Sequence, residues 1–401
     1  MRFAIFTLGC KVNQYESQRI RQGLVAAGHV EQAFTDPGAD CYIINTCTIT
    51  HRADAEGRRL ARRALRQGGR VVVTGCQVVV YPEDIGAISE EIEVVRPDRL
   101  PDVLGVDLPR FLSGFGSQSR AFVKVQQGCD RYCSYCIVPM ARGRPVSRPW
   151  QDVITEIRIL SEKGYREVVL TGINIGLYEG GLARLVQKVL THTSVPRIRI
   201  SSMEPWTVED CLVEMIALEP RVCRHLHLPL QHASDTVLSA MGRPYTAGYA
   251  AALVKSMKES IPEMAVGADV IVGFPGEDDK AFEESYGRIE DMDVTYLHVF
   301  PFSPRPGTVA ARLPGRPDDA TITRRSSYLR ALSRKKRQAF AAARVGGVEE
   351  ILITQTCSGR FSGVSSNYLT VAASGQAAAG SLVQVRLTAL DGQTLQGELL
   401  G

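Results

Sequence analysis

The feature that most constrains the fold is a regular alternation of strand-like and helix-like segments between residues 120 and 300. Short apolar runs predict strands at 122–126, 167–171, 197–201, 225–230, 265–272 and 295–300. Helical stretches follow the first five, with clear examples at 152–163, 182–190, 208–217, 247–260 and 280–291. Repeated β/α units predict parallel strands, and six of them predict a partial (β/α)6 barrel that is open on one side.

The loop after the first of these strands carries Cys129, Cys133 and Cys136 in the spacing C-x3-C-x2-C. Active-site residues of such barrels lie in the loops at the carboxyl ends of the strands. Three thiolates can bind one face of a four-iron cluster, and since full ligation takes four cysteines, one iron stays open for a small chelating molecule. A zinc knuckle or three buried thiols are the alternatives. Zinc sites favour paired C-x2-C motifs, and no second pair exists here.

This spacing resembles the signature of the radical S-adenosylmethionine (SAM) superfamily, which implies that SAM occupies the open iron. Polar or glycine-containing loops also follow the other strands of the barrel, as a ligand site requires. The candidate SAM contacts in these loops are Tyr135 for the adenine ring, Thr171 and Gly172 for the methionine ammonium, Ser201 and Glu204 for the ribose or amino group, and Asn174. A core tyrosine, a plain turn and a surface carboxylate are the structural alternatives.

Two histidines, His225 and His227, alternate along the fourth strand. We expect them to line the barrel or to be satisfied core residues rather than metal ligands, because no cysteine or carboxylate partner is evident.

A second group of cysteines follows the strands predicted in the N-terminal third, at 3–8, 41–45 and 70–74. Cys10, Cys47 and Cys76 each come just after one of them, and helical stretches at 16–27 and 52–70 alternate with the strands. This order predicts a parallel α/β sheet with helices on both faces, and its carboxyl edge would gather the three thiols. We therefore expect a second three-cysteine cluster site. The alternative is inert buried cysteines, which is our interpretation of Cys41, inside a strand.

Basic residues concentrate in two helical segments. The segment 52–70 is rich in Arg and is either a solvated face or a phosphate-binding face. Residues 316–344 contain nine basic and two acidic residues, a net charge of +7 against +4 for the whole chain. A helix with so large an excess of positive charge favours a polyanion partner over a merely solvated face. The candidate RNA-binding residues are Arg334, Lys335, Lys336 and Arg337.

Short alternating segments at 350–354, 359–363, 369–372, 382–387 and 394–400 predict a small C-terminal β-barrel, a fold that often binds RNA. A linker is predicted at 97–118 from its Pro, Gly and Ser content. The length of 401 residues favours two to three domains. Ten cysteines, several in cluster-like spacing, favour a reducing cytoplasm, and no apolar stretch is long enough for a membrane span or signal peptide.

Taken together, these motifs resemble the methylthiotransferase family of radical SAM enzymes over essentially the whole chain. The resemblance implies a methylthiotransferase domain at 1–112, a radical SAM core at 115–343 and a TRAM RNA-binding domain at 345–401. The run from Thr7 to Glu16, TLGCKVNQYE, is similar to the branch that modifies threonylcarbamoyladenosine in tRNA. The motifs HLHLPLQ at 225–231 and GFPGE at 273–277 also fit the family. His232-Ala233-Ser234 replaces the usual Ser-Gly-Ser, and Ser365 replaces a usual Thr.

The family implies two [4Fe-4S] clusters and SAM as cofactors. SAM bound at Cys129, Cys133 and Cys136 would yield a radical that abstracts hydrogen from C2 of the adenine. The cluster on Cys10, Cys47 and Cys76 would present the methylated sulfur. Implied partners are tRNA and an electron donor such as flavodoxin or ferredoxin, with the enzyme a cytoplasmic monomer and the chemistry carried by the cofactors.

Two alternatives stay open at this point. One is the same chemistry on isopentenyladenosine in tRNA or on an Asp of a ribosomal protein. The other is a non-catalytic iron–sulfur protein that binds RNA.

Overall fold

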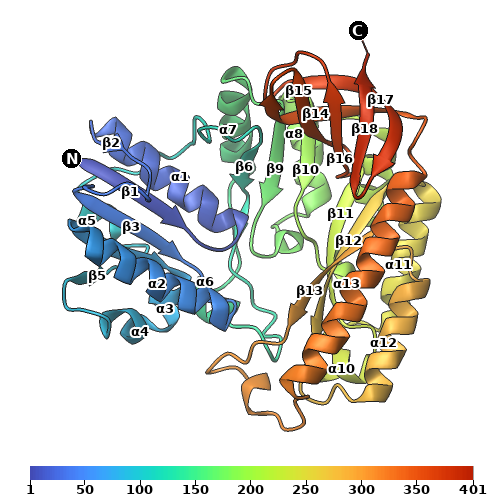
Figure 1. The fold of residues 1–401 in the computed structure, drawn as a ribbon, viewed down its shortest axis with the longest axis horizontal. Coiled ribbons are helices and arrows are strands. Elements are labelled where there is room, and N and C mark those ends of the chain that lie inside the picture. Colours follow the sequence, from blue (N-terminus) through green and yellow to red (C-terminus); the bar gives the residue numbers. More distant parts are fainter. Residues whose placement is uncertain (401) are drawn as a thin grey trace. The chain divides into compact units, whose positions relative to one another are not determined.

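A parallel sheet in the order β2-β1-β3-β4-β5 forms the centre of the first of two units in the computed structural model, which describes residues 1–400 (Figure 1). This unit comprises Met1–Leu112, Gln127–Val146 and Ser303–Ala311. Its strands are β1 (Arg2–Thr7), β2 (Val30–Glu31), β3 (Cys41–Thr46), β4 (Arg70–Gly75) and β5 (Ile92–Val94). Its helices are α1 (Lys11–Ala26), α2 (His51–Gln67), α3 (Cys76–Val80), α4 (Pro82–Gly86), α5 (Leu100–Leu104) and α6 (Val138–Arg142).

Helices cover both faces of this sheet, as the alternating pattern predicts. On one face Leu60 and Ala64 of α2 pack against Tyr42 and Val73. On the other face α1 contributes Ile20 and Leu24, which pack with Ile43 and other strand residues. The first helix begins five residues earlier than the expected 16–27, directly after Cys10. The linker expected at 97–118 contains the short helix α5, whose Leu100 and Leu104 are buried in the same cluster as Leu24.

The second unit comprises Ser113–Gln126, Ser147–Phe302 and Arg312–Gly401, of which the structure describes residues up to 400. Its parallel strands form two sheets, β10-β9-β6 and β11-β12-β13. The strands are β6 (Ala121–Lys124), β9 (Glu167–Thr171), β10 (Arg197–Ile200), β11 (His225–Gln231), β12 (Ala265–Val272) and β13 (Tyr296–Pro301). The predicted barrel strands and the open α/β architecture are thus confirmed, although the sheet is divided between β10 and β11.

Helices follow the strands of this core as predicted. They are α7 (Trp150–Glu162), α8 (Leu182–His192), α9 (Asp210–Leu218), α10 (Asp235–Ala240), α11 (Ala247–Ser260), α12 (Asp279–Asp291) and α13 (Asp319–Ala342). Single-turn helices η1 (Ile175–Leu177), η2 (Pro205–Thr207) and η3 (Ala310–Arg312) lie in loops, and β7 (Gln126–Gln127) pairs with β8 (Val146–Ser147). In residues 1–400, no helix combines the length and the apolar composition needed to cross a membrane.

The C-terminal segment folds into the predicted closed β-barrel, consistent with a TRAM-like domain. Its strands pair in the order β14-β15-β16-β18-β17 around Ile351, Phe361, Val371, Val385 and Leu395. Their bounds are β14 (Val348–Cys357), β15 (Arg360–Ser365), β16 (Thr370–Ser374), β17 (Leu382–Asp391) and β18 (Thr394–Leu399). Ser365, the predicted departure from the family pattern, is buried, and its hydroxyl accepts a hydrogen bond from Leu369 N at 3.0 Å.

Buried charges attach this barrel to the core of the second unit. Arg199 donates to the carbonyl oxygens of Ser365 and Ser366, both at 3.0 Å, and Arg197 donates to Val364 O at 3.2 Å. Both guanidiniums also pair with Glu167, whose side chain is fully buried. Burial alone would raise the pKa of Glu167, but the two arginines outweigh it and the pKa is lowered. The carboxylate therefore compensates both cations at the attachment.

We predict that Glu167→Gln lowers the free energy of unfolding by about 3–5 kcal/mol, because it leaves two buried guanidiniums without a counter-charge. Urea titration measures the change. Glu259→Gln, which breaks the exposed pair with Lys255, is the control and should cost less than about 1 kcal/mol. A Glu167 variant as stable as the wild type would contradict this role.

Candidate active site

The three N-terminal cysteines lie at the carboxyl ends of adjacent parallel strands. Cys10 precedes α1, Cys47 follows β3, and Cys76 begins α3 directly after β4. Because β1 pairs with β3 and β3 with β4, topology brings these positions together. The structure therefore gathers the three residues as the sequence predicts.

Asn13 occupies the centre of this group. Its side-chain nitrogen donates to Leu8 O at 2.8 Å and to Thr46 O at 2.9 Å, which fixes the ends of β1 and β3. Its side-chain oxygen lies 3.7 Å from Cys10 Sγ and 3.9 Å from Cys76 Sγ. The amide thus orients the cysteine-bearing segments relative to one another.

Gly9 has no side chain at the point where Cys47, just after β3, approaches it. It has φ +98°, and a Cβ at this position would lie 2.8 Å from Cys47 Cβ and 3.0 Å from its Sγ. Any larger residue would displace Cys47, so the Gly-Cys order is required by the geometry of the three thiols.

A buried guanidinium from the second cysteine segment completes the group. Arg142, the last residue of α6, donates through Nε to Cys76 Sγ at 3.1 Å and through Nη1 to Glu16 Oε1 at 2.6 Å. Its Nη2 donates to Asn13 Oδ1. Burial alone would lower the pKa of Arg142, but Glu16 and Cys76 outweigh it, so the guanidinium stays charged. Sequence reasoning missed this residue, since Arg142 is six positions beyond Cys136 and carries no motif.

Burial disfavours the free thiolates of two of these cysteines. Burial raises the pKa of Cys47 and raises that of Cys76 to about 12, while Arg142 acts in the opposite direction on both. Iron–sulfur ligation requires thiolates, whose charge the cluster irons and a neighbouring cation compensate. Three cysteines with one buried arginine beside them, and Gly9 allowing Cys47 to approach, fit a cluster with one iron not ligated by cysteine.

The C-x3-C-x2-C segment lies in the same unit, between β7 and α6. Cys129 N donates to Gly143 O at 3.0 Å, and Cys136 N donates to Cys133 O at 2.9 Å, so the segment is a closed loop. Cys133 is buried, and Cys129, Cys136 and Tyr135 are half-buried. Both cysteine groups thus belong to one compact unit, which the division into predicted domains did not anticipate.

The segment after β13 supports this loop. Ala310 N donates to Ser134 O at 2.7 Å, and Tyr81 donates its hydroxyl to Pro306 O at 2.8 Å. The buried Arg305 pairs with Asp54 at 2.5 Å and donates to Thr48 at 2.9 Å. Arg305 thus attaches the Pro- and Gly-rich loop 301–307 to α2, and Ala310 attaches the residues after it to the cysteine loop.

The remaining candidate SAM residues lie at strand ends of the second unit. Thr171 ends β9 and accepts Val125 N at 2.8 Å, and Asn174 N donates to Gln126 Oε1 at 2.9 Å. A Cβ on Gly172 would lie 2.9 Å from Gln126 O. Close packing against Gln126 thus explains this glycine without a ligand, and the predicted SAM contact at this turn stays a prediction.

Ser201 and Glu204 follow β10. Ser201 N donates to Leu170 O at 3.1 Å, which aligns this loop with the end of β9. Glu204 forms a close ion pair with the buried Arg243, whose guanidinium lies 4.7 Å from the Trp206 ring. Glu204 is therefore not a plain surface carboxylate, and its contact with SAM also stays a prediction.

One expectation about His227 is wrong. We expected no carboxylate partner, yet Asp269 on the neighbouring strand β12 lies 2.8 Å from His227 Nε2. The sequence pattern hid this contact because Asp269 sits within an otherwise apolar strand. The barrel-lining placement is confirmed, since His225 and His227 are buried and share Tyr296 as a hydrogen-bond partner at 2.9 and 3.3 Å.

The other departure from the family pattern, His232-Ala233-Ser234, forms buried contacts within the second unit. His232 is buried with Nε2 3.4 Å from Glu277, and its Nδ1 accepts a hydrogen bond from Ser234 N at 3.0 Å. Glu277 in turn accepts Gly273 N at 2.8 Å and pairs with Arg325 at 2.7 Å. His232-Ala233-Ser234 is thus joined to the GFPGE motif.

The basic helix α13 divides its charges between two sides. Lys336 is half-buried and donates to Glu290 O and Met292 O, both at 2.7 Å, while Lys335 pairs with Glu290 at 3.5 Å. Arg337 instead lies 5.6 Å from the Tyr296 ring. The predicted RNA contact of Arg334, Lys335, Lys336 and Arg337 stays a prediction, and the structure shows that Lys336 also holds the end of α12.

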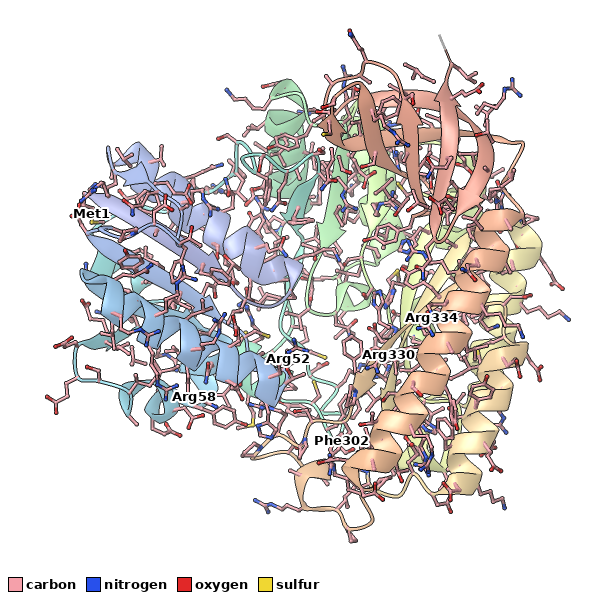
Figure 2. The ribbon with its side chains drawn as sticks, viewed as in Figure 1. Met1, Arg52, Arg58, Phe302, Arg330 and Arg334 are labelled. Carbon is pink, nitrogen blue, oxygen red and sulfur yellow. The ribbon has the colours of Figure 1, made fainter. Side chains whose placement is uncertain are left out.

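The Arg-rich helix α2 contains both paired and unpaired cations. Arg58 lies 3.6 Å from Asp84, and Arg59 pairs with Glu56 at 2.5 Å. Arg52, at the beginning of α2 (Figure 2), forms no hydrogen bond or ion pair with any residue in 1–400. The alternatives of a solvated and a phosphate-binding face both remain compatible with this arrangement.

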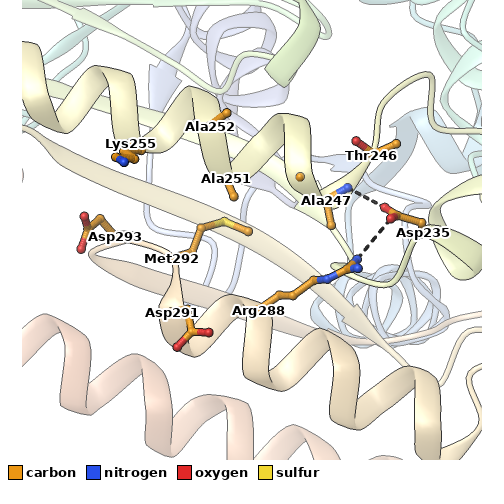
Figure 3. Close-up of a pocket in the computed structure, with 11 residues that line it drawn as sticks. Asp235, Thr246, Ala247, Ala251, Ala252, Lys255, Arg288, Asp291, Met292 and Asp293 are labelled. Carbon is orange, nitrogen blue, oxygen red and sulfur yellow. Dashed lines mark hydrogen bonds and ion pairs between the residues drawn. The ribbon is translucent and has the colours of Figure 1, made fainter.

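A surface pocket of the second unit lies among α10, α11 and α12 (Figure 3). Asp235 accepts Ala247 N at 2.7 Å and pairs with Arg288 at 3.2 Å. No predicted SAM residue within 1–400 lines this pocket. Its polar groups thus join helices and do not form part of the candidate active site.

Comparison with known proteins finds a family model for each of the two segments that carry the cysteine groups. The model of the Radical SAM superfamily matches residues 123–289, and that of the Uncharacterized protein family UPF0004 matches residues 2–96. The chain is 36% identical to the threonylcarbamoyladenosine tRNA methylthiotransferase MtaB of Chlamydia pneumoniae, covering 99% of this chain and 98% of that protein. The chain belongs to the radical SAM tRNA methylthiotransferase family. As members of this family do, it uses a [4Fe-4S] cluster and SAM.

Other relatives define the breadth of the family. The Bacillus subtilis protein of the same name is 36% identical, covering 96% of this chain and 93% of that protein. The tRNA-2-methylthio-N(6)-dimethylallyladenosine synthase of Anaeromyxobacter sp. is 33% identical, covering 98% and 93%. Among solved structures, the radical SAM methyltransferase TsrM from Kitasatospora setae shares the fold, with a TM-score of 0.55, 16% identity and coverage of 77% and 76%.

We predict that the anaerobically reconstituted protein binds about eight irons, as two four-iron clusters require. Replacing Cys129, Cys133 and Cys136 with Ala should halve the iron and abolish SAM cleavage. The exposed Cys211 and Cys357, changed to Ala together, provide a control that should retain all the iron. Unchanged iron in the triple variant would exclude two separate sites.

We also predict that Arg142→Gln weakens iron binding by the N-terminal cysteines about 10- to 100-fold, the usual effect of losing a group that supports metal ligands. The measurement is iron retained during titration with a chelator. Arg144→Gln, an exposed position two residues further on, is the matched control. Equal iron retention in the two variants would show that Arg142 does not support the site.

Proposed function

We propose that the protein adds a methylthio group to C2 of N6-threonylcarbamoyladenosine beside the anticodon of tRNA, using two [4Fe-4S] clusters. The observation that carries this proposal is the gathering of Cys10, Cys47 and Cys76 around Asn13, with Arg142 linking them to the loop of Cys129, Cys133 and Cys136. Near-full-length similarity to proteins named for this reaction supports the choice of substrate.

The chain's own residues would hold, orient and charge-balance the reacting groups. When bound, the clusters and SAM supply the radical and methylthio chemistry. Arg142 compensates thiolate charge at the N-terminal site, and Asn13 fixes the ends of β1 and β3. The basic residues of α13 and the C-terminal barrel are available to bind tRNA.

The dimethylallyladenosine reaction is the second candidate, because relatives with that name cover nearly the whole chain.

Our main proposal also includes that the enzyme is a cytoplasmic monomer that receives electrons from a flavodoxin or ferredoxin.

Separable roles of the two sites provide the direct test. In the Cys10→Ala, Cys47→Ala, Cys76→Ala variant we expect deoxyadenosine to form from SAM but no methylthio-nucleoside to appear in tRNA. Chromatography of deoxyadenosine and mass spectrometry of digested tRNA measure both yields. The Cys211→Ala, Cys357→Ala variant should produce both compounds.

If the N-terminal triple variant, with its remaining cluster verified, still methylthiolates tRNA, those cysteines do not hold the sulfur-delivering cluster. The proposed mechanism would then be wrong.

A further inference from the structure

A row of neighbouring aromatic rings lies along one face of the sheet β11-β12-β13 and becomes exposed at one end, where Tyr296 and His298 are tilted by 48° and His298 and Phe300 meet edge-on at 85°. His225 stacks on Tyr368 at 4.6 Å, Tyr296 lies 5.3 Å from His298, and His298 lies 6.4 Å from Phe300. His225 and Tyr296 are 5% and 4% exposed, whereas the His298 side chain is 53% and Phe300 45% exposed. Two aromatic rings are thus open to solvent at one end of the row, beyond the buried His225 and Tyr296.

Buried hydrogen bonds fix the orientation of the exposed end. Asp269 accepts from His227 at 2.8 Å and lies 3.3 Å from His298 Nδ1. Burial by itself would raise the pKa of Asp269, but the two histidines outweigh it and bring the pKa to about 2. The carboxylate therefore stays ionised at neutral pH and holds His298 in place, which lowers the ordering cost when a ligand stacks there.

Arginines of α13 lie beside these rings. The helix covers the open edge of β13, where Ser333 Oγ accepts Leu297 N at 2.8 Å and Arg330 donates to Val299 O at 3.4 Å. One turn apart on the side of α13 toward β13 are Arg330 and Arg334 (Figure 2), followed by Arg337 over Tyr296. Arg334 is exposed and forms no ion pair or hydrogen bond with residues 1–400.

We propose that Phe300 stacks on the modified adenine with His298 against its edge, while Arg330 and Arg334 pair with the carboxylate of its threonylcarbamoyl group. This inference rests on the proposed function and names the residues that select its substrate. An unpaired base presents a planar face that aromatic side chains stack on. Guanidinium groups bind a carboxylate in two-pronged geometry, and a dimethylallyl group offers no charge for them to bind.

The experiment compares binding of two tRNAs that differ in one modification, with or without the threonylcarbamoyl group on the adenosine. We expect the wild type to prefer the modified tRNA by about 10-fold or more, as a charge-assisted contact provides. The Arg330→Gln, Arg334→Gln variant should lose this preference. Phe300→Ala should weaken binding of both tRNAs about 10-fold through lost stacking.

Lys255→Gln, Lys280→Gln on α11 and α12 is the matched control, since it removes two exposed positive charges from other helices. It should keep the preference, and iron content verifies that each variant is folded. If the Arg330 and Arg334 variant weakens both tRNAs equally and flattens the salt dependence, the arginines bind phosphates and the inference is overturned. Retention of the preference also overturns it.

If the proposed function itself is wrong, the experiments give a different result from the one that overturns this inference. A wild-type enzyme that methylthiolates dimethylallyl-modified tRNA and not threonylcarbamoyl-modified tRNA contradicts the proposed function itself. A wild type that acts on the threonylcarbamoyl tRNA, with a preference unaffected by the arginine substitutions, contradicts the inference alone.

Discussion

The interaction on which the candidate site depends is the buried guanidinium of Arg142. It joins the helix that follows the C-x3-C-x2-C loop to Cys76, Glu16 and Asn13 of the N-terminal sheet. A charged group removed from water is tolerated only with complete partners, so its environment specifies the geometry closely. Together with the contacts of Arg305 and Tyr81, this interaction holds residues separated by more than a hundred positions in the chain in one compact unit.

The same principle operates in the second unit, where Glu167 compensates two buried arginines that attach the C-terminal barrel. In the first unit the pair of Arg142 with Glu16 joins segments that sequence analysis treats as separate domains, and in the second unit Glu167 compensates the arginines that donate to the barrel backbone. Such pairs contribute little net stability compared with apolar packing, but each is costly to break by removing one partner. Their effect is to fix which segments pack together, and in this protein those segments carry the cysteines and the C-terminal barrel.

Much of the fold could be predicted from the sequence, because strand and helix periodicity and cysteine position are local properties. The strand ends that carry Cys47 and Cys76, the barrel strands and the C-terminal barrel all appear as expected. Arg142 and Asp269 could not be found in this way, since their importance arises from partners on other strands or helices. Lys336 shows a further limit, because a basic run in the sequence does not reveal that the helix directs its members to different sides.

The central claim is that the three N-terminal thiols and the C-x3-C-x2-C loop together methylthiolate threonylcarbamoyladenosine in tRNA. Mass spectrometry of nucleosides from tRNA of cells with and without the gene tests it most directly. We expect the 2-methylthio form of threonylcarbamoyladenosine to disappear without the gene, with the unmethylthiolated nucleoside accumulating in its place. The account is contradicted if that nucleoside persists and the methylthio form of dimethylallyladenosine is lost instead.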